Sequence, residues 1–210
     1  MNFRIYPFRH ADVILSEESF VEQYKELIAI IQSITDKELI EKHLSYGFRS
    51  RENIPKSLSR AINDLLKDRF VTHGWSSESA IFQDNRYEGD VWRLDFAKND
   101  ISIEVAFNHS TVIAWNLTKP VLASELNHVK KAIQTQIGVI ITATSELKQL
   151  GGFDSAVGTF EKFIEHLPPL RNILTVPILI IGLEPPKTFR IEHDQIAPRK
   201  KIGRIVYYKK

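Results

Sequence analysis

The 210-residue sequence contains no cysteine. It therefore cannot form a disulfide scaffold, a thiolate nucleophile or a cysteine-ligated zinc or iron–sulfur site. Long apolar runs are also missing, because runs such as Val139–Ile141 and Ile178–Ile181 are far too short to span a bilayer. Arg4, Arg9 and Asp12 interrupt the N-terminal segment, which is not typical of a secretory signal. We expect a globular, cytoplasmic protein with no membrane segment.

Common catalytic motifs are missing as well. Gly151-Gly152 lacks the lysine and the flanking pattern of a phosphate-binding loop. The seven histidines have no metal-ligand spacing, and scattered Ser, His and Asp residues give no signal of a triad. Any chemistry must therefore come from another pattern.

Basic residues gather in two places although the net charge is only +2. One cluster, between positions 49 and 60, has a single acidic residue, and the other, between 198 and 210, has none. Their members are Arg49, Arg51, Lys56 and Arg60 in the first, and Arg199, Lys200, Lys201, Arg204, Lys209 and Lys210 in the second. Such clusters suit a polyanionic partner, but a solvated loop and tail would look the same.

Hydrophobic spacing predicts helices that start near Ser16, cover 37–44, follow Pro55, run from Pro120 to Gln134, and cover 157–167. Alternation over 91–107 predicts a β-hairpin, and the runs 137–142 and 176–182 predict buried strands. This order predicts an α/β fold with a mixed central β-sheet flanked by helices. We expect one domain, with an N-terminal helical part (1–54), a core (55–185) and a basic C-terminal tail (186–210).

The hairpin brings two acidic residues together. A two-residue turn at Asn99-Asp100 pairs residues whose numbers sum to 199, so Phe96 faces Ile103 on the apolar face. On the other face Asp95 lies opposite Glu104. Opposed carboxylates repel, so three interpretations remain: a solvated pair, a pair sharing one proton, or ligands of a divalent cation.

An ordered set of motifs resembles a known family. The set consists of Gly74-Trp75, Leu94-Asp95-Phe96-Ala97-Lys98, 103–108, 137–142 followed by Ser145-Glu146-Leu147, and 177–182. Together they resemble the BglII/BstYI group of type II restriction endonucleases, within the PD-(D/E)XK nuclease superfamily. The resemblance covers 55–185.

The resemblance implies a homodimer that hydrolyses double-stranded DNA at a short palindromic site with Mg²⁺, with Mn²⁺ as an expected substitute. Asp95 and Glu104 match the metal-binding carboxylates. In relatives, the residue two positions after the glutamate is Lys, Gln or Glu, but here it is Ala106. Another group fills the role, or hydrolysis is weak, or the chain is a substituted form of an active enzyme. Asn108 is the nearest polar candidate, and Glu78 is a candidate acid from a preceding helix.

The resemblance also assigns DNA contacts. The segment after the 137–142 strand would enter the major groove near the bases, and relatives favour sites with a GATC centre. Its candidate residues are Thr144, Ser145, Lys148, Gln149, Asp154 and Ser155. The basic clusters, with Arg49, Arg51, Lys56, Arg60, Arg199, Lys200 and Lys201, would contact phosphates. The helix predicted at 120–134 is the expected dimer interface.

Three other functions compete with this one. A DNA-binding protein of the same fold would have lost cleavage through Ala106. A nuclease of the same superfamily would serve DNA repair. An unrelated α/β interaction protein would bind neither metal nor DNA in a salt-dependent way.

Overall fold

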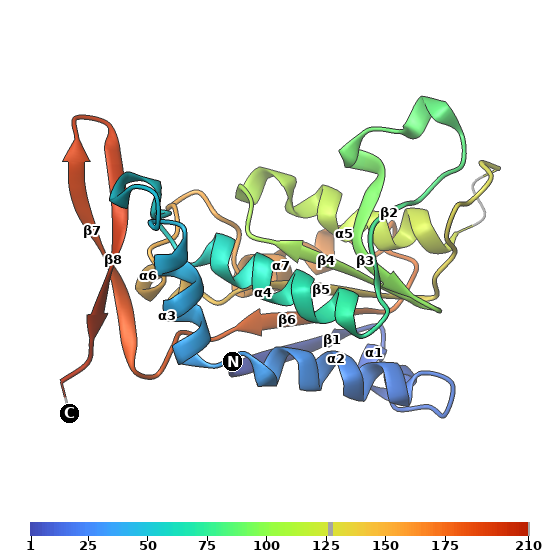
Figure 1. The fold of residues 1–210 in the computed structure, drawn as a ribbon. Helices are drawn as coiled ribbons and strands as arrows, with labels where there is room; N and C mark the ends of the chain where they lie inside the picture. Colours follow the sequence, from blue (N-terminus) through green and yellow to red (C-terminus); the bar gives the residue numbers. More distant parts are fainter. Residues whose placement is uncertain (126–127, 210) are drawn as a thin grey trace.

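Two apolar runs of the sequence form neighbouring central strands of a six-stranded mixed sheet, in the order β1-β6-β5-β4-β3-β2 (Figure 1). The computed structural model describes residues 1–125 and 128–209. The strands are β1 (Phe3–Phe8), β2 (Ser76–Ala80), β3 (Arg93–Lys98), β4 (Ile101–Ala106), β5 (Ile137–Ala143), β6 (Ile178–Leu183), β7 (Phe189–Ala197) and β8 (Lys200–Tyr207). Strands β4, β5 and β6 are parallel, and the remaining pairs are antiparallel. The predicted mixed α/β sheet is confirmed.

Helices cover both faces of this sheet. They are α1 (Ala11–Leu15), α2 (Val21–Ser33), α3 (Asp36–Ser45), α4 (Ser59–Thr72), α5 (Ile113–Ser124), α6 (Ser145–Leu150) and α7 (Phe160–Leu170). Short 3₁₀ turns lie at Arg51–Asn53, Asn85–Tyr87, Asp90–Trp92 and Ser110–Val112. Within the described ranges, no helix has the length and apolarity needed to cross a membrane.

The side chains of β5 and β6 alternate between two cores. Val139 and Ile181 pack with α2 and α4 on one face, and Ile140 and Ile180 pack with α5 and α7 on the other. Because both faces are covered, these strands are apolar at nearly every position instead of every second one. This two-sided burial explains why the sequence showed them as continuous runs.

Strand β1 was not predicted. It pairs antiparallel with β6 at the edge of the sheet, from Phe3 opposite Leu183 to Phe8 opposite Ile178. Arg4, Ile5 and Tyr6 of this strand are exposed. The half-buried Pro7 is tolerated because one side of the backbone of an edge strand has no partner strand. Polar and apolar residues are mixed in this edge strand, so its sequence had no pattern that distinguished it from the charged segment around it.

Several predicted helix boundaries were wrong. Ser16 ends α1 and its hydroxyl donates back to the Asp12 carbonyl, so α2 begins only at Val21. Helix α4 begins at Ser59 and does not include Pro55 in its first turn. Helix α7 continues to Leu170 through both prolines of its last turn.

The segment 186–210 is not a loose tail. Strands β7 and β8 form a two-stranded sheet that stands at one end of the main sheet, beside α3 (Figure 1). Phe189, Ile191 and Ile202 are buried. The ring of buried His43 on α3 also bonds to the Gly203 carbonyl on β8. The hairpin is therefore anchored to the core, while Lys210 lies outside the described residues.

Candidate active site

The β3–β4 hairpin has the register that its turn predicted. Phe96 pairs with Ile103, and Asn99 in the turn has a φ of 50°, a left-handed conformation that asparagine tolerates. Within the described residues, the ladder between these strands extends no further than this pair. The strands therefore separate at the next residues, Asp95 and Glu104.

The side chain of Asp95 occupies the place where the strands separate. Its Oδ2 accepts a hydrogen bond of 2.6 Å from the backbone N–H of Val105. Burial raises the pKa of Asp95, and the bond from Val105 opposes this shift. The carboxylate is thus held by the backbone of β4 and not by an arginine or lysine of its own.

Glu104 is almost completely buried, with 3% of its surface exposed. Burial and then the charge of Asp95 raise its pKa to about 8, against the opposing charge of Lys119. Lys119 donates to Glu104 Oε2 over 2.8 Å. The other oxygen, Oε1, is buried and has no hydrogen-bond partner among the described residues. One oxygen of the Glu104 carboxylate is therefore buried without a hydrogen-bond donor among the described residues.

Helix α5 supplies Lys119, which the sequence analysis missed. The helix predicted at 120–134 in fact begins at Ile113 and ends at Ser124, and part of the predicted range, 126–127, lies outside the described residues. Pro120 lies inside the helix instead of at its first turn. The proline rests on Gly138 of β5, where a Cβ atom would lie only 2.4 Å from the proline Cβ. This close approach places Lys119 beside β4.

A small pocket of about 120 Å³ opens on the other side of Asp95. Asn63 of α4, Glu78 of β2 and Val105 line it together with Asp95. Glu78 was expected on a helix, but it lies on a strand, at the position that the β2–β3 register sets opposite Asp95. Asn63 was missed because a polar residue on an amphipathic helix gives no distinct signal.

Glu78 adds negative charge to this pocket. It has a left-handed φ of 53°, and its charge is among the influences that raise the pKa of Asp95. Lys67 of α4 lies 3.4 Å from the Glu78 carboxylate. Glu78 therefore already has a cationic partner on the exposed side of the pocket.

Asn108, the predicted polar substitute, points elsewhere. Its Oδ1 accepts from the Nδ2 of Asn116 on α5 over 3.0 Å, and its backbone carbonyl accepts from Gly158. The bond to Asn116 ties the end of β4 to α5. Ala106 is buried among apolar residues of α5 such as Leu117.

The two carboxylates suit a hard divalent cation. In the described part of the chain, no three His, Cys, Asp or Glu side chains are grouped to hold a metal. Magnesium commonly uses only one or two carboxylates and keeps several waters, so Asp95 and Glu104 suffice. The unpartnered Oε1 of Glu104 is the atom that such an ion would satisfy.

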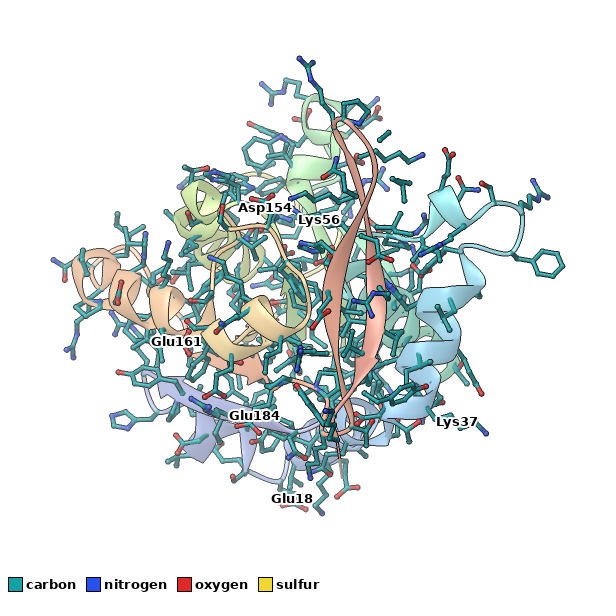
Figure 2. The ribbon with its side chains drawn as sticks, turned by 90° about the vertical axis from the view of Figure 1, so that its left-hand side faces the viewer. Glu18, Lys37, Lys56, Asp154, Glu161 and Glu184 are labelled. Carbon is teal, nitrogen blue, oxygen red and sulfur yellow. The ribbon has the colours of Figure 1, made fainter. Side chains whose placement is uncertain are left out.

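The predicted DNA-contacting segments come together at the end of the molecule that carries the β7–β8 hairpin. Ion pairs link the segment 49–60 to the hairpin and to the segment after α6. They join Arg51 to Asp194, Glu52 to Lys200, and Lys56 to Asp154. Lys56 and Asp154 lie side by side next to the hairpin in Figure 2. Segments far apart in the sequence thus form one surface.

The side chains on this surface differ in how exposed they are and in whether they already have hydrogen-bond partners. Thr144 is fully buried, and its hydroxyl caps α6 at Leu147 and donates to the Leu183 carbonyl. Ser145 bonds to Glu161, and Lys148 bonds to the carbonyls of Ser155 and Val157. The exposed predicted residues are Arg49, Arg51, Arg60, Ser145, Gln149, Asp154, Ser155, Arg199, Lys200 and Lys201.

Comparison with known proteins decides the family. The family model described as "Restriction endonuclease BglII/BglIII" matches residues 3–183. The chain belongs to this restriction endonuclease family. Its members are type II site-specific endonucleases, and the resemblance seen in the sequence is therefore confirmed.

Solved structures of BglII show the same fold. BglII complexed with a DNA 16-mer is 18% identical, with a TM-score of 0.67, and the match covers 99% of this chain and 100% of that chain. Free BglII is 20% identical, with a TM-score of 0.57 and the same coverage. No curated protein matches the chain.

Proposed function

We propose that this member of the BglII/BglIII family hydrolyses phosphodiester bonds in duplex DNA at a short palindromic site and leaves 5′-phosphates. The observation that carries the proposal is the pair of Asp95 and Glu104 at the point where β3 and β4 separate. A fold gains no stability from placing the half-buried carboxylate of Asp95 opposite the buried carboxylate of Glu104. A cation shared between them converts this repulsion into coordination, and Mg²⁺ is the proposed ion, with Mn²⁺ as a substitute.

The residues of the chain prepare this reaction in several ways. When bound, the Mg²⁺ would neutralise a phosphate oxygen and make a bound water more acidic. Asp95 is held toward the site by the backbone N–H of Val105. Glu104 presents one unpartnered oxygen from a buried position, where electrostatic interactions are stronger than in water. Asn63 and Glu78 line the pocket next to Asp95 and would contact the water or the phosphate there.

DNA would approach the end of the sheet that carries the hairpin. The solved structure with the TM-score of 0.67 is of BglII in complex with DNA, which supports duplex DNA as the ligand. Arg49, Arg199 and Lys201 are proposed phosphate contacts, because their long cationic side chains are exposed at this end of the molecule. Gln149 and Ser155 are proposed base contacts. Thr144 is buried and is therefore not a proposed base contact.

A homodimer would suit a palindromic site, since a two-fold protein matches a two-fold sequence. A GATC-centred site, the dimer and a cytoplasmic location remain predictions. Helix α5 packs on β4, β5 and α7 of its own chain. Its other side is the proposed dimer contact, now limited to Ile113–Ser124.

Ala106 favours a second candidate, a sequence-specific DNA-binding protein that cleaves poorly or not at all. Its side chain is apolar and packs against α5, so it supplies no group to the reaction. This candidate shares the fold and the DNA contacts of the first. It differs only in the rate of hydrolysis.

Incubation of the purified protein with unmethylated phage DNA, with Mg²⁺ or with EDTA, separates the candidates. Discrete fragments that require Mg²⁺ would support the endonuclease, and sequencing their ends would give the site and the cut position. Ligation of the fragments without prior phosphorylation would establish 5′-phosphates. Specific binding without fragments would support the inactive binder, and the absence of both would contradict the DNA function.

A further inference from the structure

Lys119 is a buried lysine in the middle of the candidate site. Only 8% of its surface is exposed, and its Nζ lies 2.8 Å from Glu104 Oε2. Burying an ion pair seldom adds net stability, because both ions lose their hydration. The chain nevertheless places this cation on one of the two carboxylates that are proposed to carry the reaction.

The register places Lys119 near the position that Ala106 leaves without a functional group. Glu104 and Ala106 are two residues apart on β4, so their side chains share a face of the sheet. That face is covered by α5, because Ala106 packs against Ile113 and Leu117 of this helix. Lys119 lies further along the same helix and reaches the same strand at Glu104.

Other polar groups do not serve this position. Lys67 pairs with Glu78 on the opposite side of Asp95 and is half exposed. Asn108 is bonded to Asn116. Among the described residues, Lys119 is the one cation in direct contact with Glu104.

We propose that Lys119 is the third catalytic residue and supplies from α5 the group that Ala106 cannot supply from β4. This inference rests on the proposed nuclease function. One N–H of the ammonium group binds Glu104. The other two have no acceptor among the described residues, and they donate to the attacking water and to a non-bridging phosphate oxygen. The lysine acts as a fixed cation and keeps its protons throughout.

The proposed reaction needs no proton transfer to or from Lys119. The water oxygen forms a bond to phosphorus while the bond from phosphorus to the 3′-oxygen breaks. The water loses its proton to solvent, and the 3′-oxygen takes a proton from solvent. Lys119 orients the water and offsets the charge that grows on the phosphate, a contribution that preorganised donors commonly make.

Moving the cation from position 119 to position 106 tests whether Lys119 is the third catalytic residue. Lys119→Met removes the cation, and the double variant Ala106→Lys/Lys119→Met returns it from the strand. We expect Lys119→Met to lower the single-turnover cleavage rate by about 10²-fold or more, as the loss of one preorganised donor does elsewhere. The double variant should cleave at least about tenfold faster than Lys119→Met. Lys37→Met, on the exposed side of α3, is the matched control and should cleave like the wild type.

Two further measurements separate catalysis from structure. DNA affinity in EDTA should change less than about threefold in Lys119→Met, a shift of well under 1 kcal/mol. Titration calorimetry should show that Lys119→Met binds Mg²⁺ at least as tightly as the wild type, because a competing cation has left Glu104. If Lys119→Met does not fold, the double variant and Lys119→Arg retain a cation beside Glu104 and carry the test.

The outcomes are distinct. Wild-type cleavage together with undiminished cleavage by Lys119→Met would overturn the role of Lys119 and leave the nuclease function intact. Failure of the double variant to exceed a folded Lys119→Met would also overturn it. A wild type that binds DNA specifically but never cleaves would show that Lys119 does not replace the missing group. A wild type that neither binds nor cleaves DNA would remove the proposed function itself.

Discussion

Gly138 of β5 and Pro120 of α5 are in such close contact that a Cβ atom at position 138 would lie 2.4 Å from the proline Cβ. The helix can approach the sheet this closely only because glycine has no side chain there. Since Lys119 directly precedes Pro120, this contact sets how far its ammonium group reaches toward Glu104.

Gly138→Ala should therefore displace α5 and separate Lys119 from Glu104. We expect a loss of about 1–3 kcal/mol in the free energy of unfolding, typical of overpacking, and a lower cleavage rate in the fraction that remains folded. Denaturant unfolding and single-turnover cleavage measure the two effects. Gly89→Ala is the control, because nothing lies within 4 Å of its added Cβ. Equal behaviour of the two variants would contradict this account of the contact.

The hairpin could be predicted from the sequence because local chemistry specifies it. Asn99 suits the left-handed turn, and apolar pairing of Phe96 with Ile103 leaves one register that buries an entire face. The position of Asp95 near Glu104 followed from that register. The separation of the strands at this point could not be predicted, because it depends on the bond from Val105 to the Asp95 carboxylate.

Lys119 could not be found because Pro120 was interpreted as the start of a helix, a common place for proline. A weak signal was present, since Ile113, Leu117 and Val121 recur at helical spacing on both sides of the proline. The β7–β8 hairpin had a similar signal, in the alternation of Phe189 and Ile191. Asn63 and Glu78 reach the site through tertiary packing of α4 and β2, which no local pattern records.

Removal of either carboxylate charge should greatly slow cleavage while leaving DNA binding largely intact. Asp95→Asn and Glu104→Gln keep the size of the side chain but weaken its hold on a cation, and we expect on the order of a 10³-fold loss in cleavage rate. Single-turnover cleavage and a DNA binding assay in EDTA give the two quantities. Glu146→Gln serves as the control, because Glu146 lies on the exposed side of α6 and pairs with Arg4. A variant at position 95 or 104 that cleaves at the wild-type rate would exclude that residue from the site.

Stability without metal should depend on pH through Glu104. Its pKa rises from the usual 4.5 to about 8 in the folded protein. The folded state therefore holds a proton that the unfolded chain releases, and this contribution to stability is complete below about pH 4.5 and is lost as the pH rises through 8. Mg²⁺ binds the ionised form, so its stabilising effect should grow over the same interval.

Thermal unfolding in EDTA and in Mg²⁺, measured across this pH range, checks the prediction. The difference between wild type and Glu104→Gln isolates the contribution of Glu104 from that of other titrating groups. We expect the Mg²⁺-dependent rise in melting temperature to increase with pH in the wild type and to be much smaller at every pH in the variant. A metal effect of the same size in both proteins would mean that Glu104 is not a ligand.

The exposed cations at the tip of the β7–β8 hairpin should bind DNA without reading its sequence. Arg199 and Lys201 are exposed there, and Lys200 between them is paired with Glu52. Arg199→Gln and Lys201→Gln should each weaken binding to specific and nonspecific duplexes by a similar factor. Each should also reduce the slope of log affinity against log salt by about 1, because one fewer counterion is released. Lys162→Gln, on α7, should change neither quantity. If either hairpin variant instead altered the preference among duplex sequences and left the salt slope unchanged, the hairpin would be contacting bases and not phosphates.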